Sequence, residues 1–401
     1  VGWVHPPAPI MLPLEDGNIT LPSAVFFNAD ENSVAYGRAA LAGYLSGDEG
    51  RLMRSLKSLL GSSLIDGHTE VHGRRLPFRD LLTQFIGELR RRAETSACRQ
   101  FDEAVFGRPV RFVDDDDAAD REAEATLEAI ARKVGFREIS FQYEPIGAAL
   151  HYEQSLTKEE LTLIADIGGG TADFSIARLS AKRSRRPDRT DDLLGNAGVH
   201  IGGTDFDRSL SLECIMPLLG YKTLMKSGAT VPSSIYFQLA TWHTINQAYA
   251  RQSWAELQDV LRDAGARTEI DRLRRLVTHR DGHWLALQAE QAKIALSGED
   301  KTRIGLDRLE SGLECEISRG SFEAATHALV ERVVLCVRDL LRRTGLPAKK
   351  IDTIYFTGGA SGVGHLRERI AAELPSARSV EGDLYGSIGA GLALEAARRY
   401  G

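Results

Sequence analysis

The chain has 401 residues, of which 43% are hydrophobic and 26% are charged, and its formal net charge is −6. These values are typical of a folded protein of two or three domains, and the acidic balance gives no reason to expect binding to nucleic acid or to an anionic membrane. No apolar run approaches the roughly 20 residues of a membrane span, and the four cysteines lack metal-ligand spacing, so we expect reduced thiols in a cytoplasmic protein.

The N-terminal region reads as short strands separated by turns. Residues 1–4 have the pattern of the end of a strand, and we expect this strand to begin upstream because the chain starts with valine and not with methionine. Residues 10–27 predict two strands around the turn Asp16-Gly17, a common hairpin signal. The segments predicted to be helical are residues 49–61 and 78–98.

The next region alternates strands and helices. Residues 102–112 predict a strand, a break at Gly107 and a second short strand. The four aspartates at 114–117 are expected in a solvated loop and at a helix start, where carboxylates complement the helix dipole. The elements predicted to follow are a helix over 118–135 that ends at Gly135, a strand over 138–143 and a helix that begins at Pro145.

The second half begins with a strand pair and continues mainly as helices. Residues 161–179 predict two strands joined by a glycine-rich turn, with a lobe boundary near residue 157. The basic run 181–190 is expected to be a solvated hairpin tip, with contact to an acidic partner as the alternative. The other predicted elements are helices over 208–300, an amphipathic helix over 323–344, a strand into a glycine-rich turn over 351–362 and a final helix.

The strongest motif reads Asp-Ile-Gly-Gly-Gly-Thr-Ala-Asp and spans residues 166–173. Three glycines let the backbone approach a ligand closely, and successive N–H groups in such a turn bind anions. The run does not open a helix, as a dinucleotide fingerprint does, and it lacks the lysine of a Walker loop. In this interpretation Asp166 holds Mg²⁺ through water, Thr171 donates to a phosphate and Asp173 orients the attacking water. A tight turn with acidic ends is the alternative.

This motif resembles the second phosphate-binding hairpin of the 70-kDa heat-shock chaperone family, and other segments resemble that family in the same order along nearly all of the chain. The segment SLKSLLG is similar to the one that carries the family's catalytic lysine, which gives that role to Lys57. The segment FREISFQYEPIGAALHY is similar to the one with the active-site glutamate, here Glu144. From the residues alone, Lys57 also fits a surface lysine on a helix.

Four further segments resemble parts of the family that contact the nucleotide: HIGGTDFD, AEQAKIALS, IYFTGGASG and DLYGSIGAGLA. The resemblance implies catalytic roles for Lys57, Glu144, Thr171 and Asp173, and a hydrated Mg²⁺ on Asp166 and Glu144. The nucleotide-binding residues that it implies are Asp166, Gly168, Gly169, Gly170, Thr171, Gly202, Gly203, Glu290, Lys293, Ser297, Gly358, Gly359 and Asp383. From the residues alone, Glu290 and Lys293 also fit an i,i+3 surface ion pair.

The fold that this resemblance implies is the two-lobed α/β fold of the actin-like ATPases, with ribonuclease H-like lobes and Mg-ATP or Mg-ADP between them. Lobe I would comprise residues 1–156, with 375–401 returning to it. Lobe II would comprise residues 157–374, with a mainly helical subdomain over about 208–322. Nucleotide-driven closure of the lobes would then be read by a protein partner or client.

Four departures from the family pattern bear on function. The family's opening phosphate loop is absent, and we expect it just before Val1. Ile294 and Gly362 stand where the family has arginines beside the adenosine. The closing helix is followed directly by Gly401, with no peptide-binding domain, as in a short bacterial branch of the family.

Three functions are compatible with these features. The first is a slow, heat-shock-like ATPase, and the second is a nucleotide-sensing scaffold module with little or no hydrolysis. The third is a sugar or metabolite kinase of the same superfamily, which ranks last because the sequence shows no base aspartate aimed at an acceptor hydroxyl. The sequence indicates neither the partner nor the oligomeric state.

Overall fold

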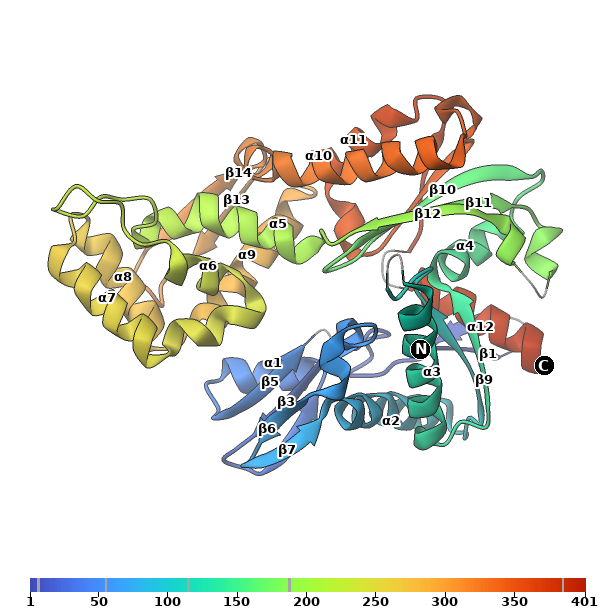
Figure 1. Cartoon of the computed structure of the whole chain (residues 1–401), viewed down its shortest axis with the longest axis horizontal. Coiled ribbons are helices and arrows are strands. Elements are labelled where there is room, and N and C mark those ends of the chain that lie inside the picture. Colours follow the sequence, from blue (N-terminus) through green and yellow to red (C-terminus); the bar gives the residue numbers. More distant parts are fainter. Residues whose placement is uncertain (6–7, 55, 114–115, 187–188, 384–385) are drawn as a thin grey trace.

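The computed structural model describes the whole chain apart from residues 6–7, 55, 114–115, 187–188 and 384–385. Two lobes face each other, and the chain crosses between them after α4 (Glu144–Gln154) and returns in α12 (Ser387–Tyr400) (Figure 1). We call the part built from β1 to α4 together with α12 lobe I, and the part from β10 to β16 lobe II.

The inner part of lobe I is organised around α12, which contacts two separate pairs of strands and crosses α4. The strands are β1 (Gly2–His5), β2 (Ala8–Met11), β8 (Glu103–Arg108) and β9 (Glu138–Tyr143). β1 pairs with β2 in the antiparallel sense, whereas β8 and β9 are parallel. The two helices approach closely because glycines meet at their crossing: a Cβ on Gly391 would lie 1.8 Å from the carbonyl oxygen of Gly147.

The outer part of lobe I packs helices against two small antiparallel sheets. Its elements are β3 (Ala24–Asn28), β4 (Ser33–Tyr36), α1 (Arg38–Leu45), β5 (Gly50–Arg54), η1 (Leu56–Leu59), η2 (Ser63–Asp66), β6 (His68–Val71), β7 (Arg74–Pro77), α2 (Phe78–Ala97) and α3 (Asp117–Val134). β3 pairs with β4 and β5, and β6 pairs with β7. Side chains from β3, α2 and α3, including Phe27, Leu81, Phe85 and Ile130, form one buried cluster. The strand and helix faces that carry these apolar residues therefore define the packing of this part.

Lobe II contains a five-stranded sheet with the order β12-β11-β10-β15-β16. The strands are β10 (Glu160–Ile167), β11 (Ala172–Leu179), β12 (Leu193–Val199), β15 (Thr353–Thr357) and β16 (Arg378–Glu381). Alternate residues of β10 enter different clusters: Leu163 packs with α10 (Arg319–Thr344), and Ile164 packs with α4 of lobe I. The sheet is covered on both faces, so β10 is a nearly continuous apolar run.

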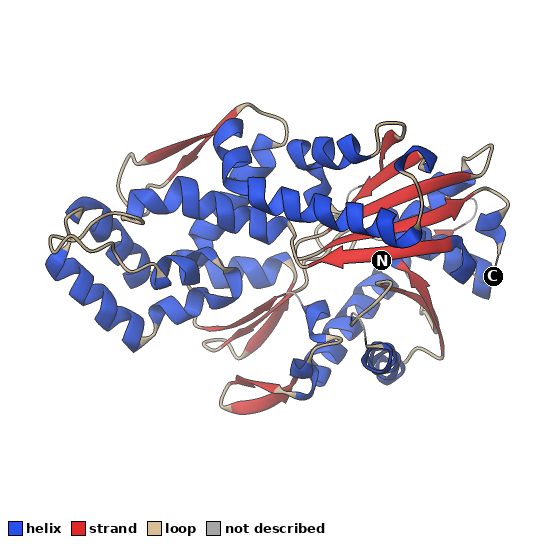
Figure 2. Ribbon diagram, turned by 45° about the horizontal axis from the view of Figure 1, so that its top comes forward, coloured by secondary structure: helices blue, strands red, loops and turns tan. Residues whose placement is uncertain are grey.

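The other end of lobe II is almost entirely helical, as Figure 2 shows. Its elements are α5 (Gly203–Leu210), α6 (Ser234–Ala240), α7 (Arg251–Asp263), α8 (Arg267–Thr278), α9 (Gly282–Leu296), β13 (Lys301–Gly305) and β14 (Glu314–Ser318). The long helix α10 leads back to the sheet, where α11 (Gly364–Glu373) also packs. Short helical turns in lobe II are η3 (Arg183–Arg185), η4 (Thr190–Asp192), η5 (Ser211–Ile215), η6 (Met216–Leu219), η7 (Trp242–Tyr249), η8 (Ala348–Lys350) and η9 (Gly359–Gly362).

Elements with strong local signals lie where the sequence predicts them. The helices over 78–98 and 118–135 are α2 and α3, and the left-handed Gly135 caps the second of them. Asp116, one of the four consecutive aspartates, caps the start of α3 through the N–H groups of Ala118 and Ala119. The strand pair over 161–179 is β10 and β11. Periodicity and capping residues were sufficient to predict each of these elements from the sequence.

Several predictions that depended on pairing partners are wrong. Residues 49–61 form β5 and the short turn η1, because β5 pairs with β3 and Gly50 lets the two backbones approach. The strands beside Asp16-Gly17 do not form a hairpin with each other, and only a single bridge joins Glu15 to Asn18. β8 runs through Gly107 without a break, since this glycine makes room for Leu392 of α12.

The basic run 181–190 is not simply a solvated tip. Arg189 is buried and forms two hydrogen bonds with the buried carboxylate of Glu153 on α4, at 2.8 and 2.9 Å. Arg183 and Arg189 also both pair with the buried Asp192. These ion pairs fix the segment against α4, because an unpaired charge would be costly in this buried position.

The segment 375–401, which was expected to return to lobe I, is divided between the two lobes. β16 pairs in parallel with β15 at the edge of the lobe II sheet. Within 375–401, α12 is the element that contacts α4 and the strands of lobe I. Among the described residues, no helix combines the length and the apolar character that crossing a membrane requires.

The glycine contact between α4 and α12 generates a stability prediction. We expect Gly391→Ala to lower the free energy of unfolding by about 1–3 kcal/mol, because the added methyl group overlaps the α4 backbone. Gly87→Ala is the matched control within α2, where no atom lies within 4 Å of the new Cβ. It should raise the free energy of unfolding by about 0.5–1 kcal/mol. Urea unfolding followed by circular dichroism measures both, and effects of the same sign would contradict the prediction.

Candidate functional site

The glycine-rich turn between β10 and β11 forms an open hairpin tip. Asp166 and Asp173 are paired across the two strands, so both carboxylates lie at the base of the turn. The Gly168 N–H donates to the Thr171 carbonyl at 2.9 Å, and the Thr171 hydroxyl donates to Asp173 at 2.8 Å. Nothing lies within 4 Å of a Cβ built on Gly169 or Gly170. The turn therefore presents backbone to open space, as an anion-binding turn must.

A second pair of glycines supports this turn from behind. The N–H of Gly203, at the start of α5, donates to the carbonyl of Gly168 at 3.0 Å. The N–H and the hydroxyl of Thr204 both donate to Gly169 at 2.8 Å. A Cβ on Gly202 would lie 2.4 Å from the Gly170 nitrogen, so a larger residue would displace the turn. Gly202 and Gly203 thus hold the shape of the turn.

Lobe I contributes two charged groups that face the hairpin. Glu144 begins α4, and Lys57 lies in η1 and donates to the Glu144 carboxylate. More than half of the Lys57 side chain faces solvent (55%), so the cleft is open at this point. Partial desolvation favours the neutral amine, but the negative charge of Glu144, reinforced by the two aspartates of the hairpin, raises the pKa of Lys57. Lys57 is therefore a permanent cation in the cleft.

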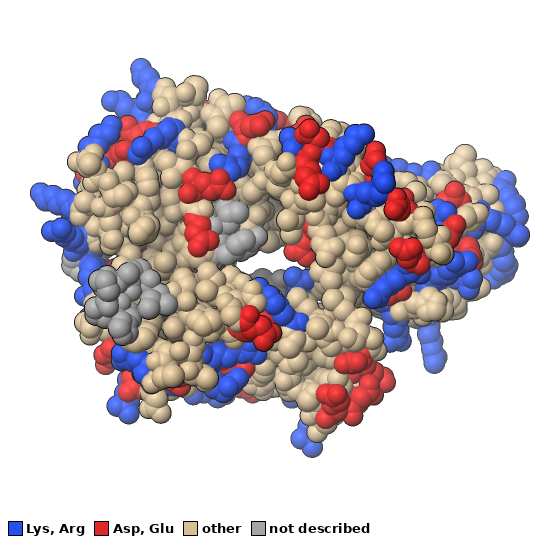
Figure 3. Space-filling model, turned by 180° about the vertical axis from the view of Figure 1, so that it is seen from behind, with Lys and Arg blue, Asp and Glu red and all other residues tan. Residues whose placement is uncertain are grey.

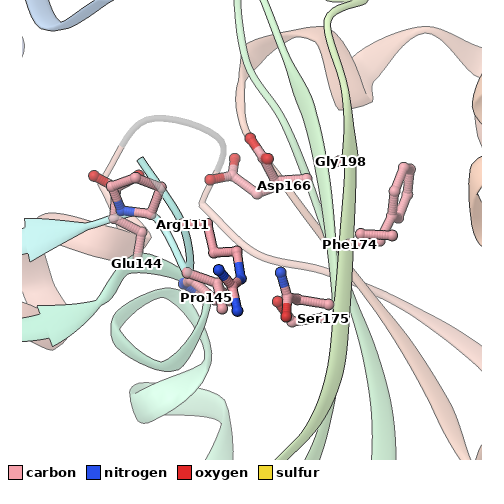
Figure 4. Close-up of a pocket in the computed structure, with 12 residues that line it drawn as sticks. Arg111, Glu144, Pro145, Asp166, Phe174, Ser175 and Gly198 are labelled. Carbon is pink, nitrogen blue, oxygen red and sulfur yellow. The ribbon is translucent and has the colours of Figure 1, made fainter. Parts of the chain in front are cut away.

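The carboxyl group of Asp166 is buried beside Glu144 and Asp173, and its pKa is strongly perturbed. Burial and the neighbouring carboxylates of Glu144 and Asp173 raise the pKa of Asp166 to about 7. The Lys57 ammonium acts in the opposite direction. Figure 4 shows Asp166 on its strand facing Glu144 across the pocket. Carboxylates that resist ionisation when crowded together are well suited to a cation, which would neutralise their mutual repulsion.

A small cavity of about 30 Å³ lies beside these carboxylates, between the two lobes. Arg111 lines it together with Glu144 and Asp166, and it also pairs with Asp117 at 2.6 Å. The sequence analysis missed Arg111. The parallel strands β8 and β9 end at the same edge of their sheet, so the residues after β8 lie beside the residues after β9. This pattern could have predicted that Arg111 lies beside Glu144.

The residues expected to hold the nucleoside lie along α9. Lys293 is buried and pairs with Asp207 at 2.8 Å and with the Gly203 carbonyl at 3.2 Å. The alternative of a surface pair between Lys293 and Glu290 is therefore wrong, because a buried ammonium requires a partner close to it. Burial raises the pKa of Asp207 to about 6, and Lys293 opposes this effect. α9 is thereby tied to α5, directly behind the glycine-rich turn between β10 and β11.

Other residues of this group are more exposed. The Ser297 hydroxyl donates to the Lys293 carbonyl at 3.2 Å, and Ile294 is 57% exposed beside it. Glu290, one turn earlier, lies near Arg54 of lobe I, where burial lowers the pKa of the guanidinium and the Glu290 carboxylate opposes this effect only in part. An exposed isoleucine between polar neighbours gives an apolar patch on α9.

The second glycine-rich turn, after β15, lies against the first. Gly358 has a φ of 82°, and a Cβ there would lie 2.5 Å from the Ile167 carbonyl oxygen. Gly359 is exposed and begins η9, which also contains Gly362. Asp383 lies before α12, where its carbonyl accepts the Ser387 N–H at 3.3 Å. The two glycine turns therefore meet at the ends of adjacent parallel strands, β10 and β15.

The lobes also touch at the far side of the cleft. The Tyr44 hydroxyl of α1 lies 2.9 Å from the Asn246 side-chain oxygen and 3.0 Å from His283 Nδ1. The Arg54 guanidinium lies over the Trp242 ring, 4.0 Å from its centre. Burial lowers the pKa of His283 to about 4, so this contact involves a neutral imidazole at neutral pH. Figure 3 shows the space-filling surface hollowed between these lobes.

The residues fit a hydrated magnesium ion better than a directly chelated metal. Within the described part of the chain, no three His, Cys, Asp or Glu side chains are grouped closely enough to hold a metal ion by themselves. Mg²⁺ keeps several waters and binds through one or two carboxylates together with phosphate oxygens. Asp166 and Glu144, which face each other beside an open anion-binding turn, match that requirement.

In a comparison with protein-family models, the chain matches the model described as Hsp70 protein over residues 8–217 and 258–397. These two ranges include the phosphate hairpin, Lys57, Glu144 and the α9 residues. The stretch between them, 218–257, contains Trp242 and Asn246 of the contact between the lobes.

The raised pKa of Asp166 predicts a pH-dependent stability difference. The native state binds this proton more tightly than the unfolded state, so the wild-type free energy of unfolding falls as the pH rises from about 4 to about 7. We expect Asp166→Asn to raise the free energy of unfolding of the ligand-free protein by about 1–3 kcal/mol near pH 8, and to change it little near pH 4. Urea titrations at both values, with the exposed Asp259→Asn as control, test this, and an equal effect at both pH values would contradict it.

Proposed function

The chain belongs to the Hsp70 family, whose members share the two-lobed actin-like ATPase fold, and on that premise we propose that it binds Mg-ATP in the cleft between its lobes and hydrolyses it slowly. Proteins of this family bind ATP or ADP with Mg²⁺, hydrolyse ATP and interact with client proteins. One observation carries the proposal for this chain: two lobes bring Lys57, Glu144, Asp166 and Asp173 together beside an open glycine turn.

In the proposed reaction the residues position and stabilise charge, which is most of what phosphoryl transfer requires. The backbone N–H groups of Gly169 and Gly170 would donate to the phosphate oxygens, since the Gly168 N–H already donates to Thr171, and Lys57 would place a positive charge beside the terminal phosphate. Asp173, which already accepts the Thr171 hydroxyl, orients the attacking water. Bound magnesium would supply charge neutralisation, with Asp166 and Glu144 holding its water ligands.

The nucleoside would lie on the α9 side of the cleft. Glu290, Lys293 and Ser297 of α9 would line this region together with the second glycine pair, Gly358 and Gly359. The base would contact Ile294, whose exposed apolar side chain replaces the charged group of the family pattern. We expect contact of the base with this side chain to be chiefly hydrophobic.

Arg111 supports the proposal as a second cation beside the carboxylates. Its pairing with the exposed Asp117 can be exchanged for a phosphate without burying an unpaired charge. A guanidinium in this position would stabilise the charge on the transferring phosphoryl group, as arginines do in other nucleotide hydrolases.

A second function, nucleotide-dependent binding with little turnover, is favoured by the contact between the lobes. Tyr44 and Arg54 close the cleft through hydrogen bonding and stacking on α9 and η7. Such contacts slow the release of a bound nucleotide and make lobe position depend on it. Binding without hydrolysis would place the protein in this second class.

The first experiment is calorimetric titration of Mg-ATP and Mg-ADP into the 401-residue chain, followed by single-turnover hydrolysis. We expect micromolar binding that Asp166→Ala abolishes, because the magnesium water shell loses its carboxylate. Lys57→Ala should lower the hydrolysis rate by about 10²–10³-fold and change the dissociation constant much less, since the charge acts mainly on the transition state. Lys349→Ala, at an exposed position of lobe II, is the matched control. Absence of binding would overturn the proposal, and binding without turnover would select the second function.

The contact between the lobes leads to a prediction about how fast a bound nucleotide is released. Tyr44→Phe keeps the ring but removes the hydrogen bonds to Asn246 and His283. We expect release of a fluorescent ADP analogue to become about 2–10-fold faster, as befits the loss of one net hydrogen bond. Tyr221→Phe in the helical part of lobe II is the control. Unchanged release in stopped-flow experiments would mean that this contact does not limit opening.

A further inference from the structure

Arg54 is the last residue of β5, and its side chain reaches from lobe I to lobe II. Its guanidinium lies over the ring of Trp242, and the residue is half-buried. Within the part of the chain that the structure describes, the guanidinium forms no ion pair and no hydrogen bond. Arginine stays protonated in proteins and carries several N–H donors. Arg54 therefore presents a fixed cation whose donors are available to a ligand.

The stack of Arg54 on Trp242 lies against the start of α9. The Trp242 ring packs on His283 with their centres 4.6 Å apart. Glu290 and Ile294 follow His283 by about two and about three helical turns, so all three residues share one face of α9. Figure 1 shows α9 and β5 on opposite lobes, facing each other. Arg54 and Glu290 therefore face the same space from opposite lobes.

Glu290 is the carboxylate in this region that lacks a cation. Both Glu290 and Asp207 act on the charge of Arg54, but Asp207 is paired with Lys293 at 2.8 Å. For Glu290, no ion pair and no hydrogen bond of the side chain is formed among the described residues. A guanidinium only donates hydrogen bonds and a carboxylate only accepts them. A group that fills the space between Arg54 and Glu290 must therefore do both, as a pair of neighbouring hydroxyl groups does.

The order of the cations on lobe I matches the order of the parts of a nucleotide. Lys57 follows Arg54 in the same short segment and donates to Glu144, beside the glycine-rich turn proposed to hold the phosphates. On lobe II, Lys293 joins α9 to the Gly203 carbonyl behind that turn and lies one turn from Glu290. A nucleotide with its phosphates at the turn would thus bring its ribose toward Arg54 and Glu290.

We propose that Arg54 is a ribose-binding residue, which donates to the ribose hydroxyls from lobe I while Glu290 accepts from them on lobe II. This assignment rests on the proposed function, since it concerns the sugar of the nucleotide in the cleft. Stacking on Trp242 would hold the plane of the guanidinium in place. A nucleotide without these hydroxyls would leave two half-buried charged groups without partners, so the cleft would select ribonucleotides.

Calorimetric titration of the full chain with Mg-ADP and with Mg-dideoxyADP, which lacks both ribose hydroxyls, tests the assignment. We expect the wild type to bind Mg-ADP at least about tenfold more tightly, because hydrogen bonds to charged groups are lost with the hydroxyls. Arg54→Met keeps an unbranched stem against Trp242 but removes the donors, and should narrow this preference to about twofold or less. Arg54→Gln, whose amide is too short to reach, should narrow it equally.

Arg51→Met is the matched control, because Arg51 is exposed and points to the opposite face of β5 from Arg54. This variant should keep the full preference for Mg-ADP. Circular dichroism of each variant establishes that it is folded.

Three results would overturn the assignment. The first is equal affinity of the wild type for the two nucleotides. The second is a full preference retained by Arg54→Met and Arg54→Gln. The third is an equal weakening of both nucleotides by these variants, since Arg54 would then act only by holding the lobes together. Absence of any binding to the wild type would instead overturn the proposed function itself, and is distinguished from the other results by the Mg-ADP titration alone.

Discussion

The repulsion among three carboxylates in one cleft is the constraint on which the rest of the structure depends. Asp166 and Asp173 lie on paired strands and cannot separate, and Glu144 faces them from the other lobe. Burial and this crowding raise the pKa of Asp166 to about 7, and the Lys57 ammonium acts in the opposite direction. The site is thus assembled by the approach of the two lobes and is poised to gain from a bound cation.

Rigid supports hold these groups in place despite the repulsion. β10 is buried on both faces of the central sheet, so Asp166 cannot move away without disturbing two clusters of side chains. α4 is fixed by the close glycine contact with α12 at one position and by Glu153 with Arg189 at another. The actin-like fold therefore places a rigidly packed strand or helix behind each carboxylate. A preorganised electrostatic site requires such support.

Local chemistry in the sequence predicted a large part of the fold and of the site. The glycine run, the helix signals and the strand pair at 161–179 were predictable because turn, capping and periodic patterns act over a few residues. β5 was not, because its pairing with the distant β3 overrides the local helical pattern. The alternative that paired Lys293 with Glu290 along its own helix fails, because Lys293 is buried and pairs with Asp207. Tyr44 contacts Asn246 and His283 of the other lobe, and no local pattern encodes such a contact.

Two of the five residues in the contact between the lobes lie outside the region that matches the family model. Trp242 and Asn246 lie within 218–257, whereas every residue proposed to touch phosphate lies inside the matched ranges. The residues proposed to hold the phosphates and two residues of the contact proposed to slow nucleotide release thus lie in different segments of the chain. On this proposal, substitutions within 218–257 would change the residence time of a bound nucleotide and leave the residues of the cleft unchanged.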